Sequence, residues 1–501
     1  MNFEFSPNSL EKISSDVIVV FAFAADKKEQ GIVPLESFSD MDKALGGKLI
    51  KASELLKFKA KRGETFSFVT ENKILSPLVI AVGLGKKSEF IADDLRRAMG
   101  SLVTKVNRKA KSVALEVPSE DETSLGLNTS ARLIAEGMLL GNYEFAKYKT
   151  QEKDKKILST VIFSKLIGKG IKDGLEKARI HAEATGLARD LVNEQSAVAT
   201  PTYLANIAKD IAKKDPSHIN CRIYNKEQAE RMGMEAFLGV ARAAATPPRF
   251  IHLEYKPSGS IKGKNKLAIV GKGITFDSGG INVKPGSSMM DMKMDMSGAA
   301  IVLAVFSVIS KIKPDFPVIG LIAATPNLIS GTSLVPGDVV KALNGKTIEI
   351  LDTDAEGRVT MADSLSYAVK QGATEILDFA TLTGACMVAL GDDITGLFSN
   401  NRDLAERVKK AAFDAGEKMW ELPLEKQYKE MNKSEVADIS NIPNSRYGGA
   451  ITAALFLEEF VDGKPWVHMD IAGPAFASKH NDFGPKGGTG HGVRTVLNLL
   501  S

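Results

Sequence analysis

The chain has 501 residues, of which 44% are hydrophobic and 25% are charged. These proportions are ordinary for a globular protein, and the length is enough for two or more domains. The 65 basic and 61 acidic residues leave a net charge of only +4, which gives little support for nucleic acid or an anionic membrane as a partner. The two cysteines, Cys221 and Cys386, form neither a disulfide framework nor a CxxC metal site, which favours a reducing compartment.

The N-terminal sequence MNFEFSPNSLEK lacks a basic segment followed by an apolar one, so no signal peptide is predicted. The longest apolar run, residues 298–310, is too short to span a bilayer and is expected to form a buried helix. Together these features predict a cytoplasmic protein without a membrane segment.

The first third of the chain alternates strand-like and helix-like segments. Residues 90–109 and 130–143 have apolar side chains at helical spacing. Buried strands are expected at four short runs rich in β-branched residues, 16–23, 76–85, 112–118 and 157–164. This alternation predicts an α/β domain with a mainly parallel sheet, which we assign to residues 1–165.

A long helical pattern at 171–194 leads into a second α/β region, assigned to residues 166–501. Its strands are expected at 221–225, 249–255, 266–274, 317–325, 375–382 and 466–473. Its helices are expected at 201–214, 226–236, 298–312, 357–371, 402–419 and 450–461. The pattern predicts a large central sheet.

Several common catalytic motifs are missing. The Gly-Lys-Thr at 345–347 has Val340 where a P-loop needs glycine, and it precedes a strand-like run instead of a helix. Neither GxSxG nor HExxH occurs, and the six histidines form no spaced ligand pair. A metal bound by this chain would therefore have mostly oxygen ligands.

Two acidic, glycine-containing segments follow predicted strands. The second of them, LDTDAEGRVTMADSL at 351–365, carries Asp354 and Glu356. The first, residues 270–300, carries Lys272, Asp277, Lys284, Asp291, Lys293 and Asp295. Ligands in open α/β sheets bind at the carboxyl ends of the strands, so we expect the two segments to converge.

Carboxylates brought together in this way would repel one another. Two divalent cations roughly 3.5–4 Å apart would neutralise them, lower the pKa of a shared water and polarise a carbonyl. A lysine beside such cations would shift toward its neutral form and could ligate zinc, manganese or cobalt. Solvated surface loops are the alternative; they account for any single residue but account less well for both segments together.

The same segments closely resemble the leucine aminopeptidase (cytosol aminopeptidase) family of di-zinc exopeptidases. VGKGITFDSGG, KPG and MKMDMSGAA resemble its first metal segment, and DTDAEGR followed by ADSL resembles its signature, usually written NTDAEGR. Further similar segments are DFATLTGA, ADISN, GGAITAALFLEEFV, WVHMDIAGPA and TGHGVR. The resemblance covers residues 180–501. It implies a smaller N-terminal α/β domain with an oligomer-forming or regulatory role, and a larger catalytic α/β domain whose central mixed sheet is flanked by helices.

The resemblance also implies a ligand set for two divalent metal ions per subunit, zinc or manganese, with cobalt as a further candidate. Lys272, Asp277, Asp295 and Glu356 would hold the tightly bound ion. Asp277, Asp354 and Glu356 would hold the exchangeable ion, so that Asp277 and Glu356 bridge the two. Asp352 stands where the family usually has asparagine, which adds a negative charge beside the ligands.

Two further residues receive catalytic roles from the resemblance. Lys284 would polarise the scissile carbonyl and stabilise the oxyanion, and Arg358 would anchor a bicarbonate that acts as general base. Asp363, His468 and Asp470 are expected to have packing or supporting roles. The side-chain pocket of the substrate is expected to include Met292, Thr381, Gly384 and Ala475.

These features predict an aminopeptidase that removes N-terminal residues, with leucine and other apolar residues preferred, from peptides with a free N-terminus. Its expected state is a cytoplasmic homohexamer. A dipeptidase acting on Cys-Gly would use the same site and remains an alternative. A secondary DNA-binding role is the other alternative, and the small net charge gives it little support.

Overall fold

The computed structural model describes residues 1–26, 31–106, 110–150, 158–166, 168, 170–259 and 265–501. These residues form two compact units. Unit 1 consists of Met1–Glu183 with Lys479–Lys486, and unit 2 consists of Ala184–Ser478 with Gly487–Ser501. The division falls inside the long helix α6, Lys172–Asn193. The assignment of separate roles to residues 1–165 and 166–501 stays a prediction.

Unit 1 is built on one sheet with the strand order β1-β7-β6-β2-β5-β4, in which β3 also pairs with β2. The first five of these strands run parallel, and β3 and β4 run antiparallel to their neighbours. The strands are β1 (Asn2–Phe5), β2 (Val17–Ala24), β3 (Ile32–Pro34), β4 (Thr65–Val69), β5 (Leu78–Lys86), β6 (Ser112–Leu115) and β7 (Thr160–Phe163). The predicted parallel α/β architecture and its four strands are confirmed.

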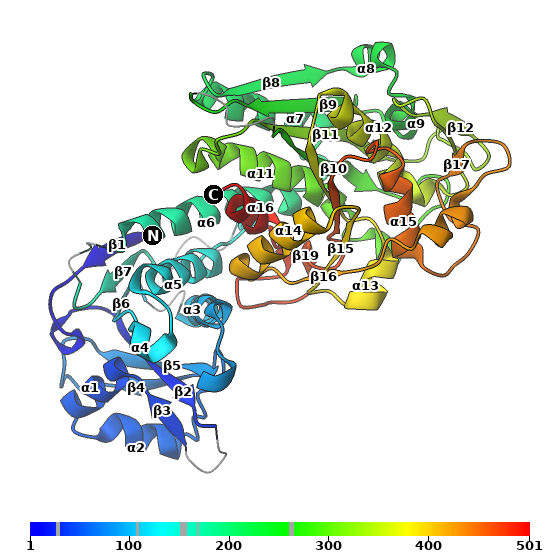
Figure 1. Ribbon diagram of the computed structural model, residues 1–501. Helices are drawn as coiled ribbons and strands as arrows, with labels where there is room; N and C mark the ends of the chain where they lie inside the picture. Colours follow the sequence, from blue (N-terminus) through cyan, green and yellow to red (C-terminus); the bar gives the residue numbers. More distant parts are fainter. Residues whose placement is uncertain (27–30, 107–109, 151–157, 167, 169, 260–264) are drawn as a thin grey trace. The chain divides into compact units, whose positions relative to one another are not determined.

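Helices cover both faces of this sheet (Figure 1). Successive side chains of a strand point to opposite faces, so Val19 and Phe21 of β2 pack against α3 and α5 while Val20 packs against α1 and α2. The helices are α1 (Glu36–Ala44), α2 (Lys48–Leu55), α3 (Ala92–Val106), α4 (Glu120–Thr123) and α5 (Leu127–Gly141). The predicted helices at 90–109 and 130–143 correspond to α3 and α5; residues 107–109, like residue 157 of the predicted fourth strand, lie outside the described residues.

Unit 2 has a mixed sheet in the order β16-β15-β18-β14-β10-β11-β9-β8. Its centre, β18-β14-β10-β11, is parallel, and β9 runs antiparallel to both β8 and β11. The strands are β8 (Ile219–Tyr224), β9 (Arg249–Tyr255), β10 (Leu267–Asp277), β11 (Val318–Asn327), β14 (Glu375–Ala380), β15 (Thr395–Ser399), β16 (Met419–Glu421) and β18 (Trp466–Asp470). All six predicted strands of this region are present.

Helices lie against both faces of this sheet (Figure 1). Val270 of β10 packs with α12, whereas a Cβ on Gly271 would lie 2.3 Å from the carbonyl oxygen of Gly298 in α11. The predicted helix at 226–236 is instead two helices that are separated at Gly233, whose φ of +83° ends α8. The helices are α7 (Pro201–Lys214), α8 (Lys226–Met232), α9 (Glu235–Ala241), α11 (Ser297–Ile312), α12 (Glu356–Lys370), α13 (Gly384–Leu390), α14 (Arg402–Ala415), α15 (Gly449–Glu458) and α16 (Val493–Leu499).

Helix α11 is the apolar run singled out in the sequence. Together with the preceding 3-10 turn it forms Met292–Ile312, the one helical segment of the described chain that is long and apolar enough to cross a membrane. In its most apolar window 78% of the residues are buried within the structure. The prediction of a buried helix is confirmed, whereas the expectation that the segment is too short to span a bilayer is wrong, because the 3-10 turn extends it to 21 residues.

Candidate metal centre

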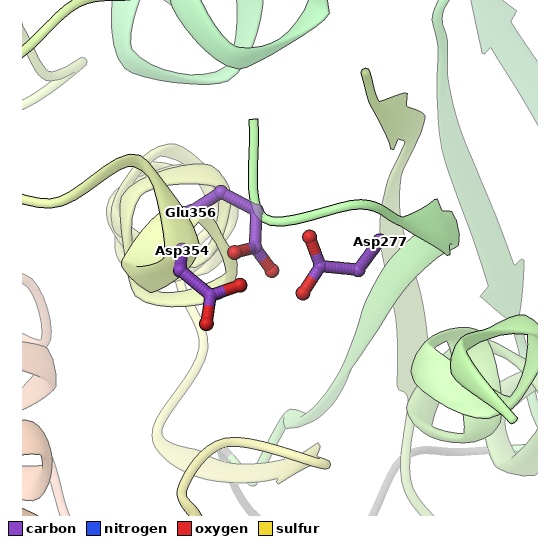
Figure 2. A group of neighbouring side chains, drawn as sticks. All are labelled: Asp277, Asp354 and Glu356. Atoms are coloured by element: carbon purple, nitrogen blue, oxygen red, sulfur yellow. The ribbon is translucent and has the colours of Figure 1, made fainter. Parts of the chain in front are cut away.

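Three carboxylates converge where strands of the unit 2 sheet end. Asp277 is the last residue of β10, Asp354 lies in the 3-10 turn η4 (Thr353–Ala355), and Glu356 begins α12. Each contributes one carboxylate oxygen, and these oxygens lie within 4.8 Å of one another, a grouping that could hold a metal ion. Figure 2 shows the three carboxyl groups facing a common space. The predicted convergence of the two acidic segments is therefore observed.

Lys272 and Asp295 extend the cluster into the interior. The Lys272 ammonium lies 2.7 Å from Asp295 Oδ1 and 3.0 Å from Glu356 Oε1, and it donates to the carbonyl oxygen of Thr381 at 3.2 Å. The Thr381 hydroxyl donates to the same Asp295 oxygen at 2.6 Å. Asp295 comes from the 3-10 turn η3 (Met292–Met296), which leads into α11.

Lys284 approaches from the more open side. Its ammonium lies 2.9 Å from Asp277 Oδ2 and 2.5 Å from Asp354 Oδ1. The Lys284 side chain is 14% exposed and that of Asp354 is 33% exposed, whereas Lys272, Asp277, Asp295 and Glu356 are nearly inaccessible. Of the seven residues expected from the sequence, six thus form one cluster that is linked by ion pairs and by the close approach of Asp277, Asp354 and Glu356.

Burial and the neighbouring charges strongly shift the pKa values of the side chains in this cluster. Burial alone would lower the pKa of Lys272, but the carboxylates of Asp295, Glu356 and Asp277 outweigh it and raise that pKa. Burial, reinforced by neighbouring carboxylates, raises the pKa of Glu356 well above its usual range. Burial also raises the pKa of Asp295 to about 6. The raised pKa values of Glu356 and Asp295 reflect the cost of burying carboxylates close together, and a bound cation would relieve this cost.

The residues fit a bound cation for a second reason. Oε2 of Glu356 and Oδ2 of Asp295 are buried and accept no hydrogen bond from any residue within the described ranges. A buried carboxylate oxygen without a donor is costly. Oxygens of this kind, with amine nitrogen nearby, suit zinc or manganese.

Arg358 is buried in the first turn of α12. One guanidinium nitrogen donates to the carbonyl oxygen of Asn441 at 2.9 Å, while the Nε group has no hydrogen-bond partner in the described chain. Burial lowers the pKa of Arg358 to about 10. A buried guanidinium with an unused donor is suited to hold a small anion.

Asp352, the position that departs from the family signature, has a local structural role. Its Oδ1 accepts a hydrogen bond from the backbone N–H of Asp354 at 2.8 Å and so caps η4. The amide oxygen of an asparagine could accept the same bond. The aspartate thus preserves the turn and adds a charge.

Two residues that support the site, Asn327 and Asn441, were not predicted from the sequence. The Asn327 side chain donates to Asp277 Oδ1 at 2.8 Å and to the carbonyl oxygen of Thr353 at 3.0 Å, so it joins the two acidic segments. Asn441 accepts from the backbone of Leu351 at 2.8 Å. For Asn327, the sequence feature that could have indicated a role is a polar side chain at the end of a buried strand.

Asp470 was expected to have a packing or supporting role, and its contacts agree with that expectation. It is fully buried at the end of β18 and accepts from the N–H of Leu382 at 3.1 Å and the hydroxyl of Thr383 at 2.7 Å. It thereby fixes the loop that carries Thr381. His468 is packed between rings and paired with Asp378 at 2.6 Å, in agreement with its expected packing role.

The four predicted pocket residues are spread over three segments. Thr381 contacts Asp295, and Met292 begins η3, the turn that carries Asp295. Gly384 begins α13, and buried Ala475 follows β18. That they line one substrate pocket stays a prediction.

Comparison with known proteins assigns the chain to a family. A family model described as the cytosol aminopeptidase family, catalytic domain, matches residues 186–497, and one for the N-terminal domain of that family matches residues 19–152. The chain belongs to the cytosol aminopeptidase family. The resemblance read from the sequence is confirmed, and the protein is a hydrolase of the leucyl aminopeptidase type.

Several known proteins are similar to this chain over nearly their whole length. A probable cytosol aminopeptidase of Aquifex aeolicus (strain VF5) is 46% identical, covering 98% of this chain and 97% of the relative. A mutant of tomato leucine aminopeptidase has a TM-score of 0.89 at 35% identity, covering 100% of this chain and 96% of that one. The bottromycin maturation enzyme BotP in complex with Mn has a TM-score of 0.84 at 32% identity, covering 97% and 99%. The predicted two-domain fold is thereby confirmed.

Proposed function

We propose that this member of the family is a two-metal aminopeptidase that releases N-terminal residues, with leucine and other apolar residues preferred, from peptides. The observation that carries the proposal is the convergence of Asp277, Asp354 and Glu356 on one space, flanked by Lys272 and Asp295. The manganese complex of BotP supports a divalent cofactor. Zinc and manganese are the leading candidates, and cobalt is a third.

The two metals would share Asp277 and Glu356 as ligands. Lys272, Asp277, Asp295 and Glu356 would hold one ion, and Asp277, Asp354 and Glu356 the other. Bound cations would neutralise the carboxylates that now keep Lys272 protonated, so its amine would become available as a ligand. When bound, the ions lower the pKa of the attacking water, polarise the scissile carbonyl and hold the free α-amino group of the substrate.

The remaining charged side chains have separate tasks. Lys284 carries the most accessible cation of the centre, and its ammonium would stabilise the negative charge that develops on the carbonyl oxygen. Arg358, with its unused Nε donor, would hold a bicarbonate that accepts a proton from the water. Thr381 and Asp470 would keep Asp295 and the adjoining loop in place.

The cellular setting is proposed from the relatives and from the family resemblance. The relatives are named cytosol aminopeptidases, which supports a cytoplasmic enzyme. A homohexamer is proposed from the family resemblance, and exposed apolar side chains on unit 2, such as Val388, Phe413 and Trp420, are available for subunit contacts. Light scattering on the purified protein would measure the subunit number.

The decisive experiment combines metal analysis with a substrate panel. We expect two divalent ions per chain, rapid hydrolysis of leucine amide and none of N-acetyl-leucine amide. Glu356→Gln should lose both metal and activity, whereas Asp315→Asn, an exposed control in unit 2, should keep both. Equal cleavage of the acetylated substrate would exclude recognition of a free amine, and a strong preference for Cys-Gly would replace the proposed specificity.

A further inference from the structure

Unit 1 contains a cavity of about 860 Å³ that is separate from the carboxylate cluster of unit 2. This volume lies within the usual range of roughly 300–1,000 Å³ for small-molecule sites. Its walls come from the ends of β2 and β5 and from the segment that precedes β4. Neither the proposed peptidase chemistry nor its ligands involve this cavity.

The cavity lies where α/β sheets commonly bind ligands. Strands β2 and β5 are parallel neighbours, so their carboxyl ends meet at one edge of the sheet. Their pairing becomes irregular there, because Ala22 is opposite Gly83 while Ala24 is opposite Lys86. The ladder thus gains one extra residue on β5, and Ala24 and Lys86 both line the cavity.

A rigid segment supplies one wall. The N–H of Gly85 donates to the carbonyl oxygen of Ala60 at 2.9 Å, and that of Gly63 donates to the carbonyl oxygen of Gly83 at 2.9 Å. The backbones approach so closely that a Cβ on Gly83 would lie 2.3 Å from the Lys61 carbonyl oxygen. Ala60 is fully buried, whereas its two neighbours in the chain, Lys59 and Lys61, are exposed. The segment therefore presents two ammonium groups from a fixed backbone.

The lining is predominantly cationic. Arg62 pairs with Asp94 at 2.8 Å, and Lys86 pairs with Glu89 at 2.7 Å. Within the described part of unit 1, Lys59 and Lys61 have no ion-pair partner. Among the described residues that line the cavity, four charged side chains are basic and two are acidic, and both acids are already paired.

From this arrangement we propose that unit 1 binds a small phosphorylated molecule in the cavity. The ammonium groups of Lys59 and Lys61 and the outer edge of the Arg62 guanidinium, whose side chain is 54% exposed, would take the phosphate oxygens. Arginine held by a carboxylate on one edge is well suited to donate to phosphate from the other. Ala24, Ala25 and Leu84 form an apolar wall of the cavity, against which an uncharged part of the ligand would pack.

Calorimetric titration of the full-length protein with ADP and with inorganic pyrophosphate tests the proposal. We expect saturable binding of one molecule per chain. The double variant Lys59→Glu/Lys61→Glu should weaken that binding by about tenfold or more, because two charge-assisted contacts become repulsive. Ala25→Phe, which fills the cavity without changing its charge, should weaken ADP binding to a similar degree. Tighter binding of ADP than of pyrophosphate would identify a nucleotide-like ligand, and equal binding would identify the phosphate group alone.

Matched control variants distinguish specific binding in the cavity from nonspecific electrostatic attraction of anions. Lys43→Glu/Lys51→Glu makes the same charge change on exposed lysines of α1 and α2 and should leave binding unchanged. Equal weakening by this control, retention of binding in Ala25→Phe, or no binding by the wild-type protein would overturn the proposal. Thermal melts of each variant would show that unit 1 is still folded. Leucine amide hydrolysis should stay at the wild-type rate in the Lys59→Glu/Lys61→Glu variant. The proposed peptidase function and the proposed phosphate site are therefore tested independently.

Discussion

At the scale of single residues, the two lysines of the centre differ in depth and should differ in role. Lys272 is buried among Asp295, Glu356 and the Thr381 carbonyl, which is the setting of a ligand. Lys284 is more accessible, and among the described residues its ammonium pairs with Asp277 and Asp354. The Lys284 ammonium in that outer position can contact a bound substrate.

We therefore expect Lys284→Ala to retain metal and lose turnover. Removing the ammonium leaves Asp277 and Asp354 with more negative charge, so cations should bind at least as tightly as in the wild type. The transition-state oxyanion loses a donor, which lowers kcat by about 10²–10³-fold. Metal analysis together with steady-state kinetics measures both quantities. Loss of metal in this variant, or wild-type kcat with full metal content, would contradict the assigned role.

Gly357, the glycine of the DAEGR segment, lies directly against the side chain of Lys272. A Cβ at this position would lie 2.3 Å from Cε of Lys272, so the space that the glycine provides is filled by the aliphatic part of that lysine. The requirement for glycine thus comes from a residue 85 positions earlier in the chain, and local pattern could not identify it.

At the scale of elements, α3 and α5 of unit 1 are packed through glycines. A Cβ on Gly137 of α5 would lie 2.1 Å from the carbonyl oxygen of Arg96 in α3, and one on Gly141 would lie 2.6 Å from that of Gly100. Such distances force backbone displacement, because neither neighbouring atom belongs to a flexible side chain. The close approach of the two helices depends on these residues.

Gly137→Ala should accordingly destabilise unit 1 even though alanine is the better helix former. The intrinsic preference favours alanine by about 1 kcal/mol, and overpacking of a tight contact costs about 1–3 kcal/mol or more. Gly186→Ala in α6, where no heavy atom would lie within 4 Å of the new Cβ, is the matched control and should be neutral or stabilising. Thermal unfolding of both variants provides the comparison. A stabilised Gly137→Ala protein would show that the helices can separate at little cost.

Helix α12 is linked to its neighbours by the buried Asp363. The two carboxylate oxygens accept from the backbone N–H groups of Phe237, at 2.8 Å, and Leu343, at 2.7 Å. Burial raises the pKa of Asp363 to about 7, despite these hydrogen bonds. The group was expected to be structural, and these contacts agree with that expectation.

Asp363 should make unit 2 less stable as the pH rises. Its folded pKa lies above its unfolded value near 3.9, so the native state binds the proton more tightly. Its favourable contribution is complete below about pH 4, falls between about pH 4 and 7, and stays constant above that. Asp363→Asn cannot ionise, so its stability should not show this decrease, whose slope is at most about 1.4 kcal/mol per pH unit. Urea unfolding followed by tryptophan fluorescence at several pH values measures it; parallel pH profiles for the two proteins would disprove it.

At the scale of the whole molecule, the sequence predicted the central strands better than the edges or the long-range contacts. Buried runs such as β2 and β10 have an unambiguous apolar pattern, whereas β1 and β4 have mixed, partly exposed patterns and were not predicted. The residues alone predicted two converging acidic segments, and the individual ligand roles came from the family resemblance. Asn327 and Asn441 reach partners 50 and 90 positions away, and such pairings leave no signal in a single sequence.

The chain also returns to unit 1 near its end, a connection that the alternation of strands and helices did not predict. Residues Lys479–Lys486 belong to unit 1 although unit 2 residues precede and follow them. Arg97 of α3 pairs with Asp482 at 3.1 Å and lies over the ring of Phe483. A single cut in the chain therefore cannot separate the two units.

The division into units predicts that metal removal acts on only one of them. All the candidate ligands belong to unit 2, and cations at about 100 times their Kd would stabilise it by about 2.7 kcal/mol. Both tryptophans, Trp420 and Trp466, also lie in unit 2, so their fluorescence reports that unit alone. Chelation should lower the midpoint of the fluorescence transition and leave amide hydrogen exchange in α3 and β5 of unit 1 unchanged. Readdition of zinc or manganese should restore the midpoint. A fluorescence midpoint that is indifferent to chelation, or increased exchange in unit 1, would show that the metals do not act through the unit 2 carboxylates.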